Sequence, residues 1–327
     1  MPSAVLFDQP GPPAVLQWRP VASLTPRPNE VVISVQAAGV NNADLLQRRG
    51  HYPVPPWAPR PLGLECAGTV TAIGSNVTGW SPGDQVCALV DGGGYADEVA
   101  VAATQVMPIP ASLTVIEAAA IPEVACTVYS NLAMIAGLTA GQTVLVHGAG
   151  GGIGTFAIQW ASAIGARVIT TAGSDIKVQH GLRLGAAVGI NYRNQDFVAA
   201  TMEATDHRGV DAILDVVGSN YLAGNVECLA PDGHLVIIGG AMAPTPLDLG
   251  LLMSKRASVT ATMLRSRPPE QKRSSWPALP EMCCLCSTRA RSGWSLTASF
   301  RCATPPGHTS SSSPNKQSAS SSSSTET

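Results

Sequence analysis

Short runs that alternate apolar and polar residues, separated by Gly and Pro, occupy roughly residues 1–120 of the chain. Residues 30–40 alternate in part and then reach a glycine, as a strand entering a turn does. Residues 68–74 form another such run, and residues 79–86 form a turn that leads into a third. This pattern predicts a compact, β-barrel-like domain over residues 1–120.

The spacing of apolar positions changes at about residue 114. Residues 116–121 have helical spacing, and residues 126–136 resume it after Pro122. Strand-like and helix-like segments then alternate. The predicted strands are residues 143–147, 167–171, 188–191, 212–217, 234–238 and 258–263, with helical composition in segments such as 177–184 and 224–229. Repeated β-α-β units of this length predict a parallel, doubly wound sheet over residues 121–272, and therefore an α/β protein.

Hydrophobic periodicity is lost after about Lys272. Serines crowd residues 310–313 and 320–324, and three cysteines fall within 283–286 without a second ligand pair to support a metal site. Such a composition buries too little apolar area to offset the entropy of ordering it. Residues 273–327 are therefore expected to form an aberrant, low-complexity tail that is irregular or disordered.

Composition and charge narrow the function. Hydrophobic residues make up 45% of the chain and charged residues 13%, which suits buried α/β cores. The formal net charge of −2 provides no attraction for nucleic acid or an acidic membrane surface. No apolar run is long enough to span a membrane, and the N-terminus lacks the pattern of a secretion signal. A cytoplasmic enzyme is expected.

The predicted strand at 143–147 runs into a glycine-rich turn at 148–154, and helical spacing follows at 155–161. This order places free backbone N–H groups and the positive end of a helix where a pyrophosphate can bind. The glycines alone leave open an ordinary strand-turn-helix unit in which they only permit close packing. The context of the turn must decide between these interpretations.

The residues after the next strand bear on the choice of cofactor. That strand, 167–171, is followed by Gly173, Ser174, Asp175 and, further on, Lys177. An acid at the strand end would repel a 2′-phosphate, whereas Ser174 and Lys177 could hold one, so NADPH is favoured over NADH. Asp175 leaves a contact with the ribose open, and Lys177 is also compatible with a solvated helix position.

The chain resembles the zinc-free quinone oxidoreductase (zeta-crystallin-like) branch of the medium-chain dehydrogenase/reductase superfamily over about residues 1–272. The resemblance implies a GroES-like catalytic domain at 1–120 beside a Rossmann NADPH-binding domain at 121–272, with the active site in the cleft between them. The matching segments, in family order, are residues 41–52, 62–68, 118–127, the glycine turn, 171–174, 184–186, 191–192 and 264–267.

The same resemblance implies a set of site residues. Asn41 and Tyr52 would be neutral hydrogen-bond donors to the substrate, and Thr127 would face the nicotinamide amide. From sequence position alone, Asn41 is also compatible with a turn residue, Tyr52 with a loop tyrosine and Thr127 with a helix-interior threonine. No side chain is expected to be an essential acid or base, because the cofactor supplies the hydride. The cofactor-binding residues implied are Gly151, Gly152, Ile153, Gly154, Gly173, Ser174, Lys177 and Tyr192, with Ile238, Gly239, Met263, Leu264 and Arg265 near the nicotinamide.

The residues at the zinc positions of related alcohol dehydrogenases define the expected chemistry. Asn41 or Asn42 stands where those enzymes have a Cys ligand, and Leu64 stands where their Gly-His-Glu motif has His. No metal ion is therefore expected. Without a Lewis acid an alcohol would lack activation, whereas a quinone or an enone needs only hydrogen-bond donors for the charge that develops on its oxygen.

The leading hypothesis is NADPH-dependent reduction of a small-molecule quinone or enone. The alternatives are an enoyl-thioester reductase, a structural or RNA-binding relative, and an inactive product of a broken reading frame. The low positive charge argues against nucleic acid as a partner. By resemblance, the protein is expected to form a homodimer through the edge strand at 258–263.

The tail suggests a frameshift near codon 273. If residues from 273 onward are back-translated with freely chosen codons and read two bases later, they can yield two strings with the amphipathic and β-branched patterns of the family's end. Resequencing the DNA across this codon tests the sequencing-error form of the hypothesis, which an intact frame would exclude.

Overall fold

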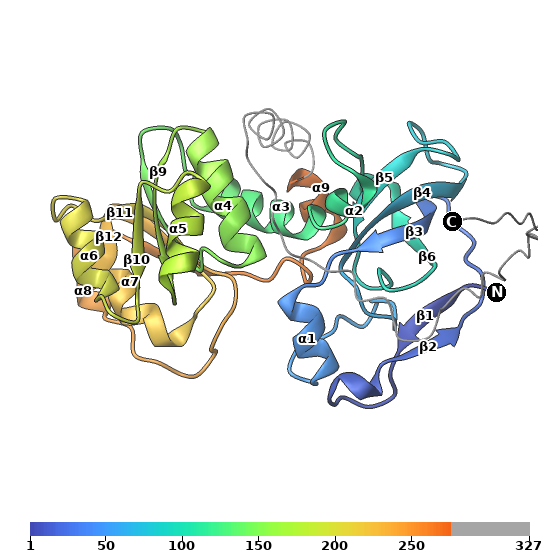
Figure 1. Cartoon of the computed structure of the whole chain (residues 1–327), viewed down its shortest axis with the longest axis horizontal. Helices are drawn as coiled ribbons and strands as arrows, with labels where there is room; N and C mark the ends of the chain where they lie inside the picture. Colours follow the sequence, from blue (N-terminus) through green and yellow to red (C-terminus); the bar gives the residue numbers. More distant parts are fainter. Residues whose placement is uncertain (276–327) are drawn as a thin grey trace, which may run out of the picture.

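The computed structural model describes residues 1–275 of the chain. Residues 276–327 lie outside the described part, and with them nearly all of the predicted tail and the consequences of a frameshift. Two bodies lie side by side along the longest axis of the molecule, one rich in antiparallel strands and one built on a parallel sheet (Figure 1).

The N-terminal body is built on an antiparallel sheet, as its alternating sequence predicts. The sheet has the order β6-β3-β4-β5-β7, and its apolar face packs around Val31, Ile33 and Val70. A separate hairpin pairs β1 with β2. The elements are β1 (Ser3–Leu6), β2 (Gln17–Pro20), β3 (Glu30–Ala38), α1 (Asn42–Arg48), β4 (Glu65–Ile73), β5 (Gln85–Leu89), β6 (Glu98–Ala102) and β7 (Val106–Pro108). The GroES-like architecture is confirmed.

The second body is a six-stranded parallel sheet in the order β10-β9-β8-β11-β12-β13. All six predicted strands form, although β11 and β12 begin earlier than the sequence indicates. Chain order reverses between β8 and β11, the switch point at which doubly wound sheets bind ligands. The strands are β8 (Thr143–His147), β9 (Arg167–Ala172), β10 (Val188–Asn191), β11 (Val210–Asp215), β12 (Leu229–Ile237) and β13 (Ser258–Ala261), and the helices are α4 (Gly152–Ala163), α5 (Asp175–Arg183), α6 (Phe197–Ala204), α7 (Leu222–Cys228) and α8 (Leu249–Ser254).

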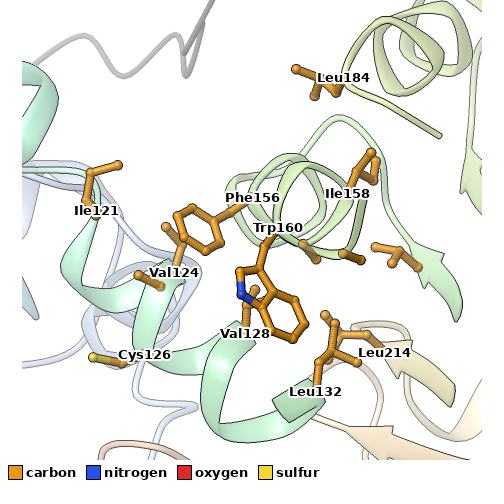
Figure 2. Close-up of a cluster of buried hydrophobic side chains, with 14 of the residues drawn as sticks. Ile121, Val124, Cys126, Val128, Leu132, Phe156, Ile158, Trp160, Leu184 and Leu214 are labelled. Atoms are coloured by element: carbon orange, nitrogen blue, oxygen red, sulfur yellow. The ribbon is translucent and has the colours of Figure 1, made fainter. Parts of the chain in front are cut away.

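The two bodies share a hydrophobic core along the helices that connect them. The connection consists of α2 (Val115–Ala118), α3 (Pro122–Val128) and a π-helix at Tyr129–Ile135. Pro122 does not interrupt a helix but begins α3, where its missing N–H costs no hydrogen bond. Phe156 and Trp160 point from α4 toward Val124 and Val128 of α3 (Figure 2).

Ile158 lies on another side of α4, fully buried, with its terminal methyl group close to Gly181 of α5 (Figure 2). We expect Ile158→Val to lower the free energy of unfolding by about 1 kcal/mol, because the lost methyl group leaves a void that a packed core fills only in part. Urea denaturation measures the change. Ile116→Val, at a position that is 67% exposed, is the control and should have almost no effect.

After β13 the chain returns to the N-terminal body. α9 (Pro269–Ser275) contacts the 3₁₀ turn at Ala103–Gln105 and the π-helix at Tyr129–Ile135, between the two bodies (Figure 1). Arg265 donates to the backbone oxygen of Asp91 and, at 2.6 Å, to Gln47 Oε1. Lys272 forms a buried ion pair with Asp91. These contacts connect the bodies at a second place. The domain limits at residues 120 and 272 stay predictions.

Candidate active site

A cavity of about 270 Å³ lies where the two bodies meet. It is lined from α1 and the loop after it, from α3, from the start of α4 and from the ends of β12 and β13. It therefore includes residues from the carboxyl edge of the parallel sheet, on both sides of the switch point. Nine of the predicted site residues line it: Asn41, Tyr52, Thr127, Ile153, Ile238, Gly239, Met263, Leu264 and Arg265.

The glycine turn connects this cavity to a helix N-terminus. A Cβ at Gly154 would overlap the backbone oxygen of Gly148, so the close approach of turn and helix requires glycine there. Gly151 is the N-cap of α4, and no side chain caps the helix. The N–H groups of its first turn, including Gly152, Ile153 and Gly154, thus have no capping side chain and can bind an anion. Ile153 reaches the cavity from this turn.

The residues predicted to distinguish NADPH from NADH surround the end of β9. A Cβ at Gly150 would lie 2.8 Å from Lys177 Cδ, so the lysine stem passes directly over the glycine turn. A Cβ at Gly173 would lie 2.5 Å from the Tyr192 hydroxyl, and only glycine leaves room for that phenol. Ser174 is the N-cap of α5. These residues lie beside the turn, outside the set that lines the cavity.

Asp175, whose direction the sequence left open, bonds to the end of β10. Its Oδ1 accepts a 2.6 Å hydrogen bond from Asn191 Nδ2. The carboxylate therefore joins the start of α5 to the end of β10 and has a structural partner in this arrangement. Ser174 and Lys177 remain with the glycine turn as groups able to hold a phosphate.

The three predicted catalytic side chains all reach the cavity, each with a defined neighbour. Asn41 caps α1, and its Nδ2 donates to Glu65 Oε1 at 2.8 Å. Burial raises the pKa of Tyr52, and the Arg265 guanidinium carbon lies 5.6 Å from the centre of its ring. Thr127 Oγ1 donates to Glu123 Oε1 at 3.1 Å. Tyr52 thus remains a neutral donor at physiological pH.

Three neighbouring carboxyl groups were missed by the sequence reasoning: Asp44 and Glu65, which are buried, and Glu123, which lines the cavity. Burial raises the pKa of Glu65 to about 8, and the neighbouring Glu123 adds to the effect. Burial likewise raises the pKa of Glu123 to about 7 and that of Asp44 above its usual range. The signal was present, because all three acids fall within segments that carry the family resemblance.

The residues present do not form a zinc site. Leu64 lines the cavity with an apolar side chain that has no donor atom, and Asn41 is bonded to Glu65. Zinc in catalytic sites takes Cys, His and carboxylate donors in threes. Residues 1–275 contain no cluster of three His, Cys, Asp or Glu side chains placed to hold a metal ion. Nor does any helix within these residues have the length and apolarity needed to cross a membrane.

The fold and the cavity together define an oxidoreductase of the medium-chain dehydrogenase/reductase superfamily. Residues 27–111 match the alcohol dehydrogenase GroES-like domain, and residues 152–282 match the zinc-binding dehydrogenase family. The quinone oxidoreductase of Pseudomonas aeruginosa is 35% identical over 258 residues, which are 78% of this chain and 79% of that protein. The chain belongs to the quinone oxidoreductase family.

Solved structures agree with this assignment. The crystal structure of Escherichia coli quinone oxidoreductase complexed with NADPH superimposes with a TM-score of 0.74 at 32% identity, covering 89% of this chain and 88% of that one. The CurK enoyl reductase gives a TM-score of 0.74 at 28% identity, covering 89% of both chains. The chain is also 36% identical to a phenolphthiocerol/phthiocerol polyketide synthase of Mycobacterium tuberculosis over 79% of its own length, but it spans only 12% of that much longer protein.

Proposed function

We propose that this chain reduces quinones or other conjugated carbonyl compounds with NADPH and without zinc. The observation that carries the proposal is the cavity in which neutral donors from the GroES-like body meet Ile153 of the glycine turn. The E. coli relative, whose structure is described as complexed with NADPH, supports the cofactor, and the names of several relatives support the acceptor.

The arrangement suits a conjugated acceptor. NADPH, when bound, supplies a hydride. Negative charge then develops on the carbonyl oxygen of the acceptor, and neutral hydrogen-bond donors aimed at that oxygen stabilise it. Tyr52 offers a phenol, and Asn41 has a second amide hydrogen besides the one it gives to Glu65. These groups provide polarisation of the kind that zinc provides for alcohols.

NADPH oxidation by the full chain, followed with a quinone, an enone and an enoyl thioester, tests the proposal. We expect turnover with the quinone and the enone. Turnover confined to the thioester would instead support the enoyl reductase function, which the CurK structure and the polyketide synthase relatives favour. Absence of NADPH oxidation with all three acceptors, in protein that folds and binds the cofactor, would support a structural, RNA-binding or inactive role.

The NADPH preference rests on Lys177 and Ser174 beside the turn. We expect Lys177→Ala to weaken NADPH binding about tenfold and to leave NADH binding unchanged, because only NADPH has the 2′-phosphate that the ammonium would hold. Quenching of tryptophan fluorescence measures both affinities. Lys177→Arg keeps the charge and is the matched control. Tighter binding of NADH than of NADPH by the wild type would contradict the preference.

We also propose that the protein acts in the cytoplasm as a homodimer paired through β13. Within residues 1–275 this strand ends the parallel sheet, with β12 as its one neighbour there. Leu249 and Met253 of the adjacent α8 are 62% and 76% exposed, so an apolar surface lies near this edge. Sedimentation equilibrium of the full chain determines the assembly, and a monomer at all concentrations would contradict the dimer.

A further inference from the structure

Of the three neighbouring acids Asp44, Glu65 and Glu123, it is Glu123 that lines the cavity, from α3. It occupies the second position of α3 and is partly exposed, with the cavity beside it. Its Oε1 accepts the hydroxyl of Thr127 one helical turn further on. Among the described residues, no group donates a hydrogen bond to Oε2. One oxygen of the carboxyl is thus held, and the other is available to a molecule in the cavity.

The buried Glu65 holds the backbone of Glu123 in position. Glu65 Oε2 accepts the backbone N–H of Glu123 at 2.9 Å, and Glu65 Oε1 accepts from Asn41. Glu65 is 2% exposed and does not line the cavity. Glu65 therefore orients the start of α3, whereas Glu123 faces the space that a substrate would occupy.

The charged and titratable neighbours favour a protonated Glu123. Three titratable groups interact with Glu123: Asp44 of α1, Glu65 of β4 and Tyr52 of the loop after α1. Each is either neutral or negatively charged, so none of them stabilises a negative charge on Glu123. Two cations of the cavity wall are bonded to other groups: Arg265 to Gln47 and the Asp91 backbone oxygen, and Lys272 to the Asp91 carboxylate. Burial, together with Asp44, accordingly raises the pKa of Glu123 to about 7.

On the basis of the proposed reduction, we propose that Glu123 is the proton donor of the reaction, with Thr127 holding its carboxyl group. The hydride and its two electrons pass to the conjugated acceptor, which leaves a negative charge on the carbonyl oxygen. The O–H bond of the Glu123 carboxyl then breaks, and a new O–H bond forms on that oxygen. Water reprotonates the resulting carboxylate before the next turnover. This assigns an acid where the sequence indicated that none was needed.

Glu123→Gln tests the assignment, because the amide keeps the shape and still accepts from Thr127 but has no acidic proton. We expect kcat to fall about 100-fold with the affinity for NADPH unchanged. In the wild type, kcat should fall as the pH rises through about 7, when Glu123 loses its proton. This step should be absent from Glu123→Gln, and Glu123→Asp should restore part of both the rate and the step. Glu203→Gln, at an exposed carboxylate on α6, is the matched control and should behave as wild type.

Infrared difference spectra provide a readout that does not depend on turnover. The difference between spectra recorded at about pH 5 and at about pH 9 should contain the carbonyl band of a protonated carboxyl that titrates near pH 7. This band should be present in the wild type and absent from Glu123→Gln. A Glu123→Gln enzyme as fast as the control overturns the assignment and leaves the proposed function standing. A wild type that reduces none of the acceptors overturns both. Melting curves show whether each variant is folded.

Discussion

Gly151→Asp is expected to reduce the affinity for NADPH about 1,000-fold while the protein melts no lower than wild type. Gly151 is the N-cap of α4 and has ordinary backbone angles, with φ at −99°. A Cβ there would meet only the Gly148 oxygen at 3.7 Å, an ordinary contact. Aspartate is also a preferred N-cap residue, so the helix itself gains. The pyrophosphate, however, would meet a negative charge, and two unit charges about 4 Å apart repel by about 4 kcal/mol near a protein surface.

Gly151→Asn is the matched control, because asparagine caps a helix equally well without a charge. It should retain much more of the affinity than the aspartate variant. Thermal shift with increasing NADPH reports stability and binding in one experiment, since a ligand that binds only the folded state raises the melting temperature. Equal affinities of the two variants would show that the pyrophosphate does not bind at the α4 N-terminus.

The free energy of unfolding is expected to fall by about 2 kcal/mol as pH rises from about 6.5 to about 8. The cause is the raised pKa of Glu65, about 8, and of Glu123, about 7, in the folded protein. The unfolded chain ionises these groups near their ordinary pKa, whereas the folded protein keeps their protons until much higher pH. The folded state therefore binds more protons in this interval, and raising the pH favours unfolding. Denaturation by urea at several pH values measures the slope.

Glu65→Gln should remove most of this slope, because the amide cannot ionise yet still accepts from Asn41 through its oxygen. Glu203→Gln on the surface should leave the slope unchanged. His147 acts in the opposite sense and at lower pH, since burial lowers its pKa to about 4. Its contribution is complete above about pH 6.5 and is lost as the pH falls from there toward 4. A wild-type stability that does not change between about pH 6.5 and 8 would contradict the buried, protonated carboxyls.

Periodicity predicted the parallel sheet well because each strand of such a sheet is buried on both faces and reads as a continuous apolar run. It predicted the strand limits less well at β12, which begins at Leu229, five residues before the predicted start. The segment between contains Pro231, Asp232 and Gly233, which read as a turn. The register of β11 and β12 shifts at this place, so the irregular stretch is accommodated inside the ladder by a bulge.

The sequence predicted only some of the residues of the candidate site. Gly151 and Ile153 could be recognised because strand, turn and helix follow one another within a few residues, and Lys177 because it follows the end of the next predicted strand, 167–171. Glu123 could not be assigned a role, because its chemistry depends on Asp44 and Glu65, which are brought beside it from α1 and β4. A carboxyl acquires a raised pKa from burial and from neighbours distant in the chain, and no local pattern encodes either.

The sequence by itself determined the two-body α/β architecture, the glycine turn at the start of α4 and the absence of Cys and His from the zinc positions at Asn41 and Leu64. The first two depend on residue types at short spacings, and the third on the family resemblance. The tertiary structure alone decided that Asp175 bonds to Asn191, that Arg265 and Lys272 bind the backbone and side chain of Asp91, and that Asp44 and Glu65 are buried beside Glu123, which lines the cavity. These features arise from packing between segments far apart in the chain, where burial and close approach determine both hydrogen bonding and protonation.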